Sequence, residues 1–409
     1  MFKGRVRIMS GRSKRGYLHR HRTGYSCYFY TFALMIFISF QQVGTVHQVP
    51  LESGVAQGTW IPTAPMIANR SGASATLLRD GTILVAGGFT GKFTSNGLNS
   101  SSAEIYNPRM DRWTKTAPLV SAVSGQTAVL LPDGTVLVVC SSVNSALLTP
   151  SAQLYSPHTR RWAATSPMHT ARKGCTATLL ATGLVLVAGG DGETSGLSSA
   201  ELYNPRTHHW TFTGSMTTGR EGHTATLLPN GTVLVAGGSD KPTFKPTLFA
   251  NPTRDEIYDP RTGTWDSTRP MITLRGSHTA TLLPNGTILV AGGGNNGFLS
   301  SAELYHVRTR AWTETGSMHE ARSGHTATLL FNDTVLVTGG STDTSAEIYV
   351  PQTGQWVETA RMHMSHFGGT ATLLPSGKVL VVGGTNTAGN LSGAELYNPL
   401  IRPSASTSE

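Results

Sequence analysis

A segment of seventeen residues recurs along this chain almost unchanged. Residues 222–238 read GHTATLLPNGTVLVAGG, and residues 277–293 read SHTATLLPNGTILVAGG. Self-similarity at a fixed period is the signature of a repeat architecture, in which each copy buries its apolar surface only against the next copy. The repeat therefore constrains the fold more than any other feature of the chain.

Seven copies keep one register. Each contains a segment such as SAELY that ends on a tyrosine: Tyr106, Tyr155, Tyr203, Tyr258, Tyr305, Tyr349 and Tyr397. In the first six, a tryptophan follows seven residues later: Trp113, Trp162, Trp210, Trp265, Trp312 and Trp356. A position that is usually arginine comes next, and then a Gly-Gly pair, which the second copy replaces by Cys140-Ser141.

The segments of each copy are typical of β-strands. HTATLL alternates in polarity, a two-residue turn follows, and TVLVAGG is a β-branched apolar run. Four copies have Asn-Gly or Asp-Gly at this turn, the strongest short signal for a hairpin. SAELY predicts a third strand, and the tryptophan segment predicts a fourth. Each copy is thus a four-stranded antiparallel sheet, and radial packing of the sheets buries their faces and protects their edges.

The last copy lacks its tryptophan, because Ser404 stands seven residues after Tyr397. Trp60 precedes Arg70 by ten residues, which is the tryptophan-to-arginine spacing of the other copies. We therefore predict an all-β fold, a seven-bladed β-propeller over residues 54–400, in which an N-terminal outer strand completes the last blade. Residues 401–409 form a C-terminal tail.

The Gly-Gly pair, the tyrosine and the tryptophan, in this order from Gly58 to Pro399, resemble the kelch-repeat propellers, the fold type of galactose oxidase. Some kelch proteins bind acidic peptide motifs at the propeller mouth, so the resemblance permits such a role here. Kelch copper enzymes that resemble galactose oxidase use a Cys–Tyr crosslink, a second tyrosine, two histidines and a domain after the propeller. We expect neither that domain nor that crosslink in this chain.

Recurrent arginines stand at the start of the inner strand, on the face of the loop between the second and third strands: Arg70, Arg172, Arg220, Arg275 and Arg322. They are candidate ligand-binding residues, because guanidinium groups suit carboxylate or phosphate. Alternatively, each braces a glutamate of the third strand. The copy with Val123 in place of arginine also has Gln153 in place of glutamate, which favours pairing within a blade.

The loop between the second and third strands varies in length, whereas the two tight turns do not. Variable loops on a rigid scaffold often carry binding. The longest ones, residues 89–101 and 239–254, contain further ligand-binding candidates: Phe89, Phe93, Lys241, Phe244 and Lys245.

Three positions further along the inner strand lie Cys175, His223, His278 and His325 on successive copies. These are remote candidates for a metal site, and the alternative is that the histidines fill space at the start of each inner strand. No acidic residue or second cysteine recurs beside them, and the chain has no nucleophile elbow, P-loop or dinucleotide motif. We expect no cofactor and lean against catalysis.

The net charge of +9 comes almost entirely from the N-terminus, and the rest of the chain carries +1. Residues 1–24 hold eight Lys or Arg and no acid, which leaves 24 of the 32 basic residues against 23 acidic ones. A nucleic-acid partner is therefore not indicated. The apolar segment within residues 25–45 follows this basic tail, as in a cleaved signal or a retained membrane anchor. An organelle transit sequence or a mis-assigned start codon are the alternatives.

These observations predict an exported or membrane-anchored, monomeric, non-catalytic binding module. Its ligand is a protein, peptide or carbohydrate held on the face of the loop between the second and third strands. The alternatives are a propeller enzyme, galactose-oxidase-like or sugar-modifying, and an intracellular kelch scaffold.

Overall fold

The computed structural model describes residues 58–90, 98–140, 150–192, 194–240 and 254–399, and residues 53–409 belong to one compact unit. All regular structure in these ranges is β-strand. No helix in them has the length and hydrophobicity needed to cross a membrane. The predicted basic tail, the signal or anchor segment at 25–45 and the C-terminal tail lie outside the described residues.

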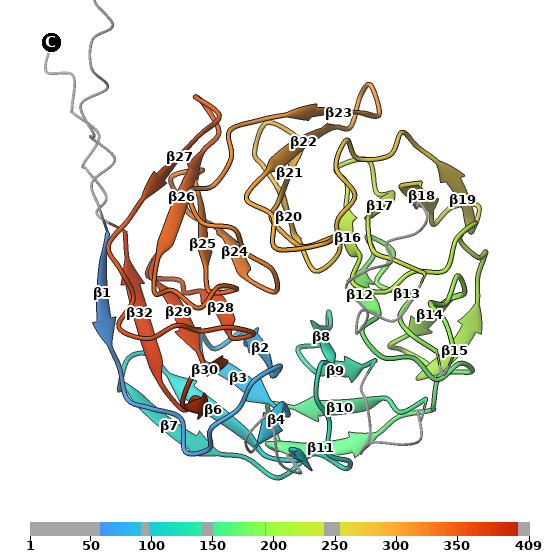
Figure 1. Ribbon diagram of the computed structural model, residues 1–409. Helices are drawn as coiled ribbons and strands as arrows, with labels where there is room; N and C mark the ends of the chain where they lie inside the picture. The colour runs from blue at the N-terminus through green and yellow to red at the C-terminus, as the bar shows by residue number, and fades with distance from the viewer. Residues whose placement is uncertain (1–57, 91–97, 141–149, 193, 241–253, 400–409) are drawn as a thin grey trace, which may run out of the picture. The chain divides into compact units, whose positions relative to one another are not determined.

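Seven four-stranded antiparallel sheets account for 28 of the strands (Figure 1). The inner strands are β2 (Ser74–Leu77), β8 (Thr127–Leu130), β12 (Thr176–Leu179), β16 (Thr224–Leu227), β20 (Thr279–Leu282), β24 (Thr326–Leu329) and β28 (Thr370–Leu373). The second strands are β3 (Ile83–Ala86), β9 (Val136–Val139), β13 (Val185–Ala188), β17 (Val233–Ala236), β21 (Thr287–Ala291), β25 (Val335–Thr338) and β29 (Val379–Val382).

The third strands are β6 (Ala103–Asn107), β10 (Gln153–Ser156), β14 (Ala200–Asn204), β18 (Glu256–Asp259), β22 (Ala302–His306), β26 (Ala346–Val350) and β32 (Ala394–Asn398). The outer strands are β7 (Arg112–Lys115), β11 (Arg161–Ala164), β15 (His209–Phe212), β19 (Thr264–Ser267), β23 (Ala311–Glu314), β27 (Gln355–Glu358) and β1 (Thr59–Pro62). Two short ribbons, β4 (Phe89–Thr90) with β5 (Leu98–Asn99) and β30 (Thr385–Asn386) with β31 (Gly389–Asn390), lie between second and third strands.

The sheets form a closed ring. Each inner strand contacts the inner strands of both neighbouring sheets, and β2 contacts β28, so blade one meets blade seven. Figure 1 shows the seven blades arranged around a common axis. β1 pairs antiparallel with β32 and sets Trp60 opposite Tyr397, so an N-terminal strand is the outer strand of blade seven. The predicted seven-bladed propeller is confirmed.

The core lies between the blades, because each sheet needs a neighbour on both faces. One cluster joins Ile83, Val85 and Trp113 of blade one to Leu380 and Val382 of blade seven. Each second strand is buried along its length except at Thr287, the first residue of β21, in keeping with a continuous apolar run rather than an alternating one. Apolar burial of this kind contributes about 25 cal/mol per Å².

The repeated tyrosine and tryptophan connect six of the seven blades to the blade before them by hydrogen bonds. Within blade one the rings of Tyr106 and Trp113 lie 4.9 Å apart. The Trp113 indole N–H donates to the Ala64 carbonyl at 2.7 Å, and the Tyr106 hydroxyl lies 2.8 Å from that of Thr63. Both partners precede blade one in the chain. Equivalent contacts occur at six of the seven junctions, whereas Tyr155 and Trp162 of blade two lack them in the described part of the chain. At those six junctions the fixed seven-residue spacing therefore reflects two polar contacts between blades, not only packing within a blade.

Candidate functional site

The five recurrent arginines are buried inside the blades, at 0–1% exposure. Each forms an ion pair with the glutamate of its own third strand: Arg70–Glu104, Arg172–Glu201, Arg220–Glu256, Arg275–Glu303 and Arg322–Glu347, at 2.7–3.3 Å. Each also donates to the carbonyl of the first glycine of the Gly-Gly pair. Pairing within blades is confirmed, and the geometry gives no support to these arginines as ligand contacts.

Blades seven and two lack the arginine, and the third-strand residue has a different partner in each. In blade seven His366 replaces the arginine, with Nε2 3.2 Å from the Glu395 carboxylate and Nδ1 2.6 Å from the Gly383 carbonyl. Burial opposes ionisation of Glu395, but bonds from His366 and His363 outweigh it and lower the pKa of that carboxyl. In blade two the Gln153 amide instead bonds Ser121, so no counter-charge is needed.

We call the opening at the start of the inner strands the mouth. It is edged by seven residues in the left-handed backbone region, with φ between 54° and 65°: Gly72, Gly125, Gly174, Gly222, Ser277, Gly324 and Gly368. At four of the seven junctions their backbones bond across blades; for example, Gly72 N–H donates to the Gly368 carbonyl and Gly125 N–H to that of Gly72. Glycine adopts this conformation without steric cost. The backbone bonds between blades then make the rim of the mouth rigid.

A pocket of about 330 Å³ opens at the mouth between blades seven, one and two. It is lined by Ser71, Gly72, Phe89, Ser124, Gly125, Phe367, Gly368 and Thr385. A second pocket of about 220 Å³ shares Phe367 and Thr385 and adds Ser341, Thr342, Ser365, Asn386 and Thr387. We call the two together the mouth pocket. Among the described residues its lining has no charged side chain, so it suits a neutral ligand with an apolar face.

Aromatic side chains from three blades meet here. The ring of Phe298, from the loop after β21, stacks on Phe367 with centroids 6.3 Å apart and planes 24° apart. Phe298 is half exposed, and Phe89 forms one wall of the pocket. Phe89 is thus the one aromatic candidate that the structure places at the mouth, whereas Phe93, Lys241, Phe244 and Lys245 lie outside the described residues.

Sequence reasoning missed Phe298 and Phe367. The signal for Phe367 is a departure from the repeat, because serine stands at its position in three copies, as Ser71, Ser124 and Ser323. Phe298 lies in a short loop that length alone does not single out. Their contact becomes visible only when the ring brings the two loops together.

The histidines His223, His278 and His325 are buried, and each has Nε2 2.9–3.0 Å from a threonine hydroxyl of the preceding blade. Burial, and then the neighbouring arginine, lowers the pKa of each imidazole to about 3. Each ring also packs on the first glycine of the preceding blade's Gly-Gly pair: a Cβ on Gly189 would meet His223 at 2.6 Å. These neutral rings therefore fit the blade junctions closely.

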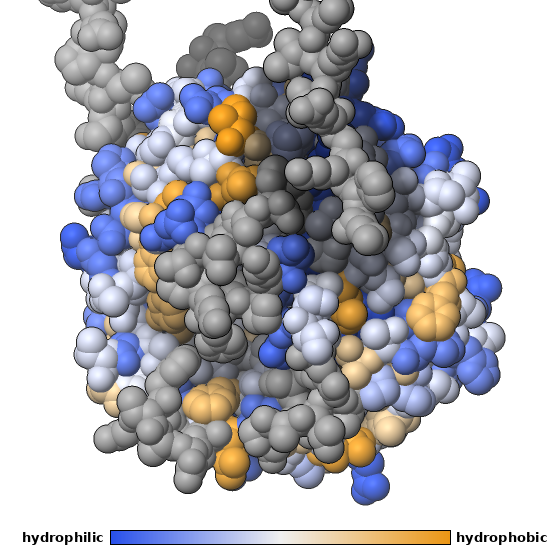
Figure 2. All heavy atoms as spheres, turned by 45° about the vertical axis from the view of Figure 1, so that its right-hand side comes forward, coloured by the Kyte–Doolittle hydropathy of each residue, from blue (hydrophilic) through white to orange (hydrophobic). Residues whose placement is uncertain are grey.

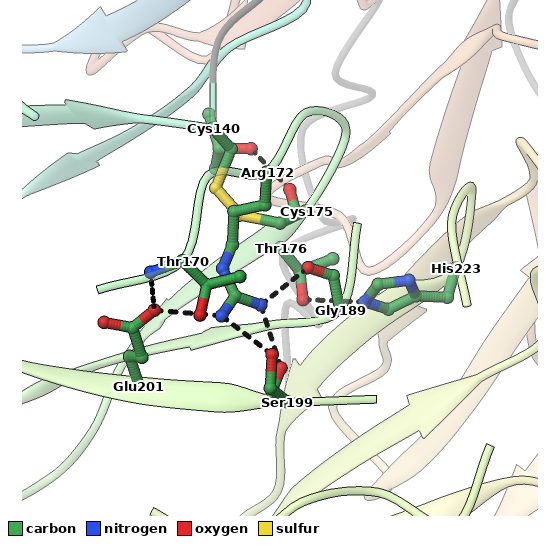
Figure 3. Close-up of a disulfide and its surroundings, with 10 residues drawn as sticks. Cys140, Thr170, Arg172, Cys175, Thr176, Gly189, Ser199, Glu201 and His223 are labelled. Carbon is green, nitrogen blue, oxygen red and sulfur yellow. Dashed lines mark hydrogen bonds and ion pairs between the residues drawn. A yellow bond between two sulfur atoms is a disulfide. The ribbon is translucent and has the colours of Figure 1, made fainter. Parts of the chain in front are cut away.

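Cys175 occupies the histidine position of blade three and forms a disulfide with Cys140, which occupies the glycine position of blade two (Figure 3). Their Cα atoms are 5.5 Å apart, within the usual range for a disulfide. Figure 3 shows this bond above the Arg172–Glu201 pair. Within the described ranges, no group of three or more His, Cys, Asp or Glu is placed to hold a metal ion.

Comparison with known proteins gives the following likenesses. The family model of the KLHDC2/KLHL20/DRC7 kelch-repeats domain matches residues 152–340, and that of the kelch motif matches residues 70–120. No curated protein sequence matches this chain.

Among solved structures, a fungal alcohol oxidase of the AA5 family, in complex with copper, is similar with a TM-score of 0.69. The alignment covers 84% of this chain and 76% of that chain, at 18% sequence identity. At this identity the likeness concerns the fold. The described residues do not fit the copper group, because Cys175 is in a disulfide and the three histidines bond threonines on separate blades.

Proposed function

Since this chain is a kelch-repeat β-propeller, we propose that it is a non-catalytic, monomeric binding module that holds its ligand at the mouth. The observation that carries this proposal is the uncharged aromatic mouth pocket. Binding sites are usually concave and mostly apolar, with a few polar groups that orient the ligand. Phe89 and Phe367 supply the apolar walls, and Ser124 and Thr385 supply hydroxyl groups.

The ligand is a protein, a peptide or a carbohydrate. A sugar ring has an apolar face that packs on an aromatic wall and hydroxyls that bond serine and threonine. An apolar peptide side chain uses the same walls, and its backbone uses the same hydroxyls. Charged ligands are disfavoured, because removing a charge from water without a partner is costly.

We further propose that the protein is exported, and is then secreted or anchored through residues 25–45. The Cys140–Cys175 disulfide supports this, since such bonds persist in oxidising compartments and are rare in the cytosol. The same bond speaks against the intracellular scaffold. The propeller enzyme stays the alternative from another class, and we derive no step through copper.

The full-length chain on glycan and peptide arrays tests this function. Phe367→Ser restores the residue found in three other copies, so the blade should fold. We expect it to weaken binding about tenfold or more through loss of the aromatic wall. Phe331→Ser, in an exposed tight turn after β24, is the matched control and should bind normally.

Equal binding by both variants would contradict the mouth as the site. Stoichiometric copper in the purified protein, measured by mass spectrometry, would contradict the non-catalytic assignment and favour the enzyme.

A further inference from the structure

The junction between blades four and five differs from the other junctions at two positions, and both differences introduce an arginine. Arg254 stands where five other blades have serine: Ser102, Ser151, Ser199, Ser301 and Ser345. Arg269 stands where the other junctions have a small residue: Ala64, Ala117, Ser166, Gly214, Gly316 and Ala360. At this one junction, both positions carry a guanidinium group.

The fold brings these arginines together with a third. Arg254, Arg269 and Arg310 line one pocket of about 600 Å³ on the outer wall of the ring. Arg254 precedes β18, Arg269 follows β19, and Arg310 lies in the turn between β22 and β23 of blade five. The hydroxyls of Ser267, Thr268 and Thr309 complete the polar lining. We call this the arginine pocket. Figure 2 brings the right-hand side of Figure 1 forward and shows hydrophilic surface there, with hydrophobic residues in small separate groups.

The positive charge of the arginine pocket is not neutralised by the described residues. All three arginines are exposed, and among the described residues none of them forms an ion pair and no acidic side chain lines the pocket. Asp255 lies beside Arg254 but is fully buried. Its two oxygens accept from the Gly237 and Met271 backbone N–H groups, both at 2.9 Å. Three like charges thus converge around an open space, an arrangement that an anion would stabilise.

We propose that the arginine pocket binds a tetrahedral oxyanion carried as a monoester, a sulfate or a phosphate on a group of about sugar size. Arginine presents planar pairs of donors that match such oxyanions. The volume is larger than a bare ion needs and lies in the range of small-molecule sites, so the esterified group enters with its anion. This site is separate from the neutral mouth pocket and does not depend on its function.

Isothermal titration of the full chain with inorganic sulfate, inorganic phosphate, glucose 6-sulfate and glucose 6-phosphate tests the proposal. We expect the esters to bind more tightly than the free ions, and their ranking distinguishes a sulfated from a phosphorylated ligand. Arg254→Ser and Arg269→Ala restore residues that other blades carry, so both should fold. Each should weaken ester binding about tenfold, because one bidentate partner is lost.

Arg310→Asn and Arg160→Asn form a matched pair. Both arginines have left-handed backbones, with φ of 53° and 55°, and occupy the same turn position in blades five and two. Arg160 lies at the junction between blades one and two, where Ser102 and Ala117 stand at the positions of Arg254 and Arg269. Only Arg310→Asn should weaken binding. No binding of either ester, or an equal loss in both asparagine variants, would overturn the proposal.

Discussion

Asp255 shows how a single residue can take over a role that the backbone fills in other blades. Six blades have alanine at this position, in the SA pair or its equivalent before the third-strand glutamate. In blade three the Gly189 and Met216 N–H groups donate to the carbonyls of Ser199 and Ser198. In blade four the corresponding Gly237 and Met271 N–H groups donate to the Asp255 carboxylate. The side chain thus satisfies two backbone donors.

Burial raises the pKa of Asp255 to about 7 from an ordinary 3.8, against the opposing effects of these two N–H groups and the charge of Arg220. Between pH 4 and 7 the folded protein therefore holds a proton that the unfolded chain has lost. The free energy of unfolding falls as pH rises through this window, by up to about 4 kcal/mol, and is level above it.

Asp255→Asn removes this titration while keeping the side-chain shape. We expect the variant to gain stability relative to the parent as pH rises from 5 to 8. The buried histidines have lowered pKa values and give the opposite slope below pH 6.5, so the quantity to measure is the difference in unfolding free energy between variant and parent. A difference that is constant from pH 5 to 8 would exclude a raised pKa for Asp255.

At the same scale, the sequence predicted the arginine–glutamate braces and the mouth aromatic Phe89, but not Phe298 and Phe367. Val123 and Gln153 depart from the repeat together, which revealed a pair inside one blade. Removing one partner of a buried ion pair strands a charge, so both positions change together. Phe367 departs from the repeat alone, so no paired change pointed to Phe298, which it meets from another blade.

Among the elements, the strands were predictable because their burial follows the repeat, but the contact between blades two and three was not. Cys140 and Cys175 are 35 residues apart and looked unrelated in the linear sequence. Aligned on the repeat, they occupy the glycine and histidine positions of adjacent blades. Three other junctions have a Gly–His contact there, at Gly189–His223, Gly237–His278 and Gly292–His325. The disulfide therefore replaces a packing contact.

This replacement of a Gly–His contact by a disulfide predicts that two variants differ in stability. Cys175→His alone removes the disulfide and sets an imidazole against the Cys140 side chain, in a space where a Cβ on Gly189 would meet His223 at 2.6 Å. We expect a loss of about 3 kcal/mol or more from the disulfide, with overpacking in addition. Adding Cys140→Gly should recover part of this loss, since the pair then matches the other junctions.

Thr127 is placed for the restored contact, because the equivalent Thr176 lies 3.0 Å from His223 Nε2. Urea unfolding of both variants under oxidising conditions measures the effect. A double variant that is less stable than Cys175→His would show that the Cys–Cys pair is not equivalent to Gly–His.

For the whole molecule, stability depends on closure of the ring, and Trp60 holds the closing strand β1 on blade seven. Trp60 is 7% exposed on β1, its indole N–H donates to the Ala360 carbonyl at 2.8 Å, and its ring lies 5.1 Å from that of Tyr397. Every other outer strand follows its own blade in the chain, whereas β1 joins blade seven from the opposite end of the propeller. Without it, the β32 edge is exposed.

Trp60→Ala should therefore cost about 3–5 kcal/mol, the range for a buried tryptophan. It should also promote self-association through the exposed edge. Trp162→Ala is the matched control, because Trp162 is only partly buried on β11 and its indole N–H has no partner in the described structure. Urea unfolding measures the loss of stability in the two variants, and light scattering measures their self-association. If Trp162→Ala costs as much as Trp60→Ala and neither self-associates, closure contributes no more than packing within any one blade.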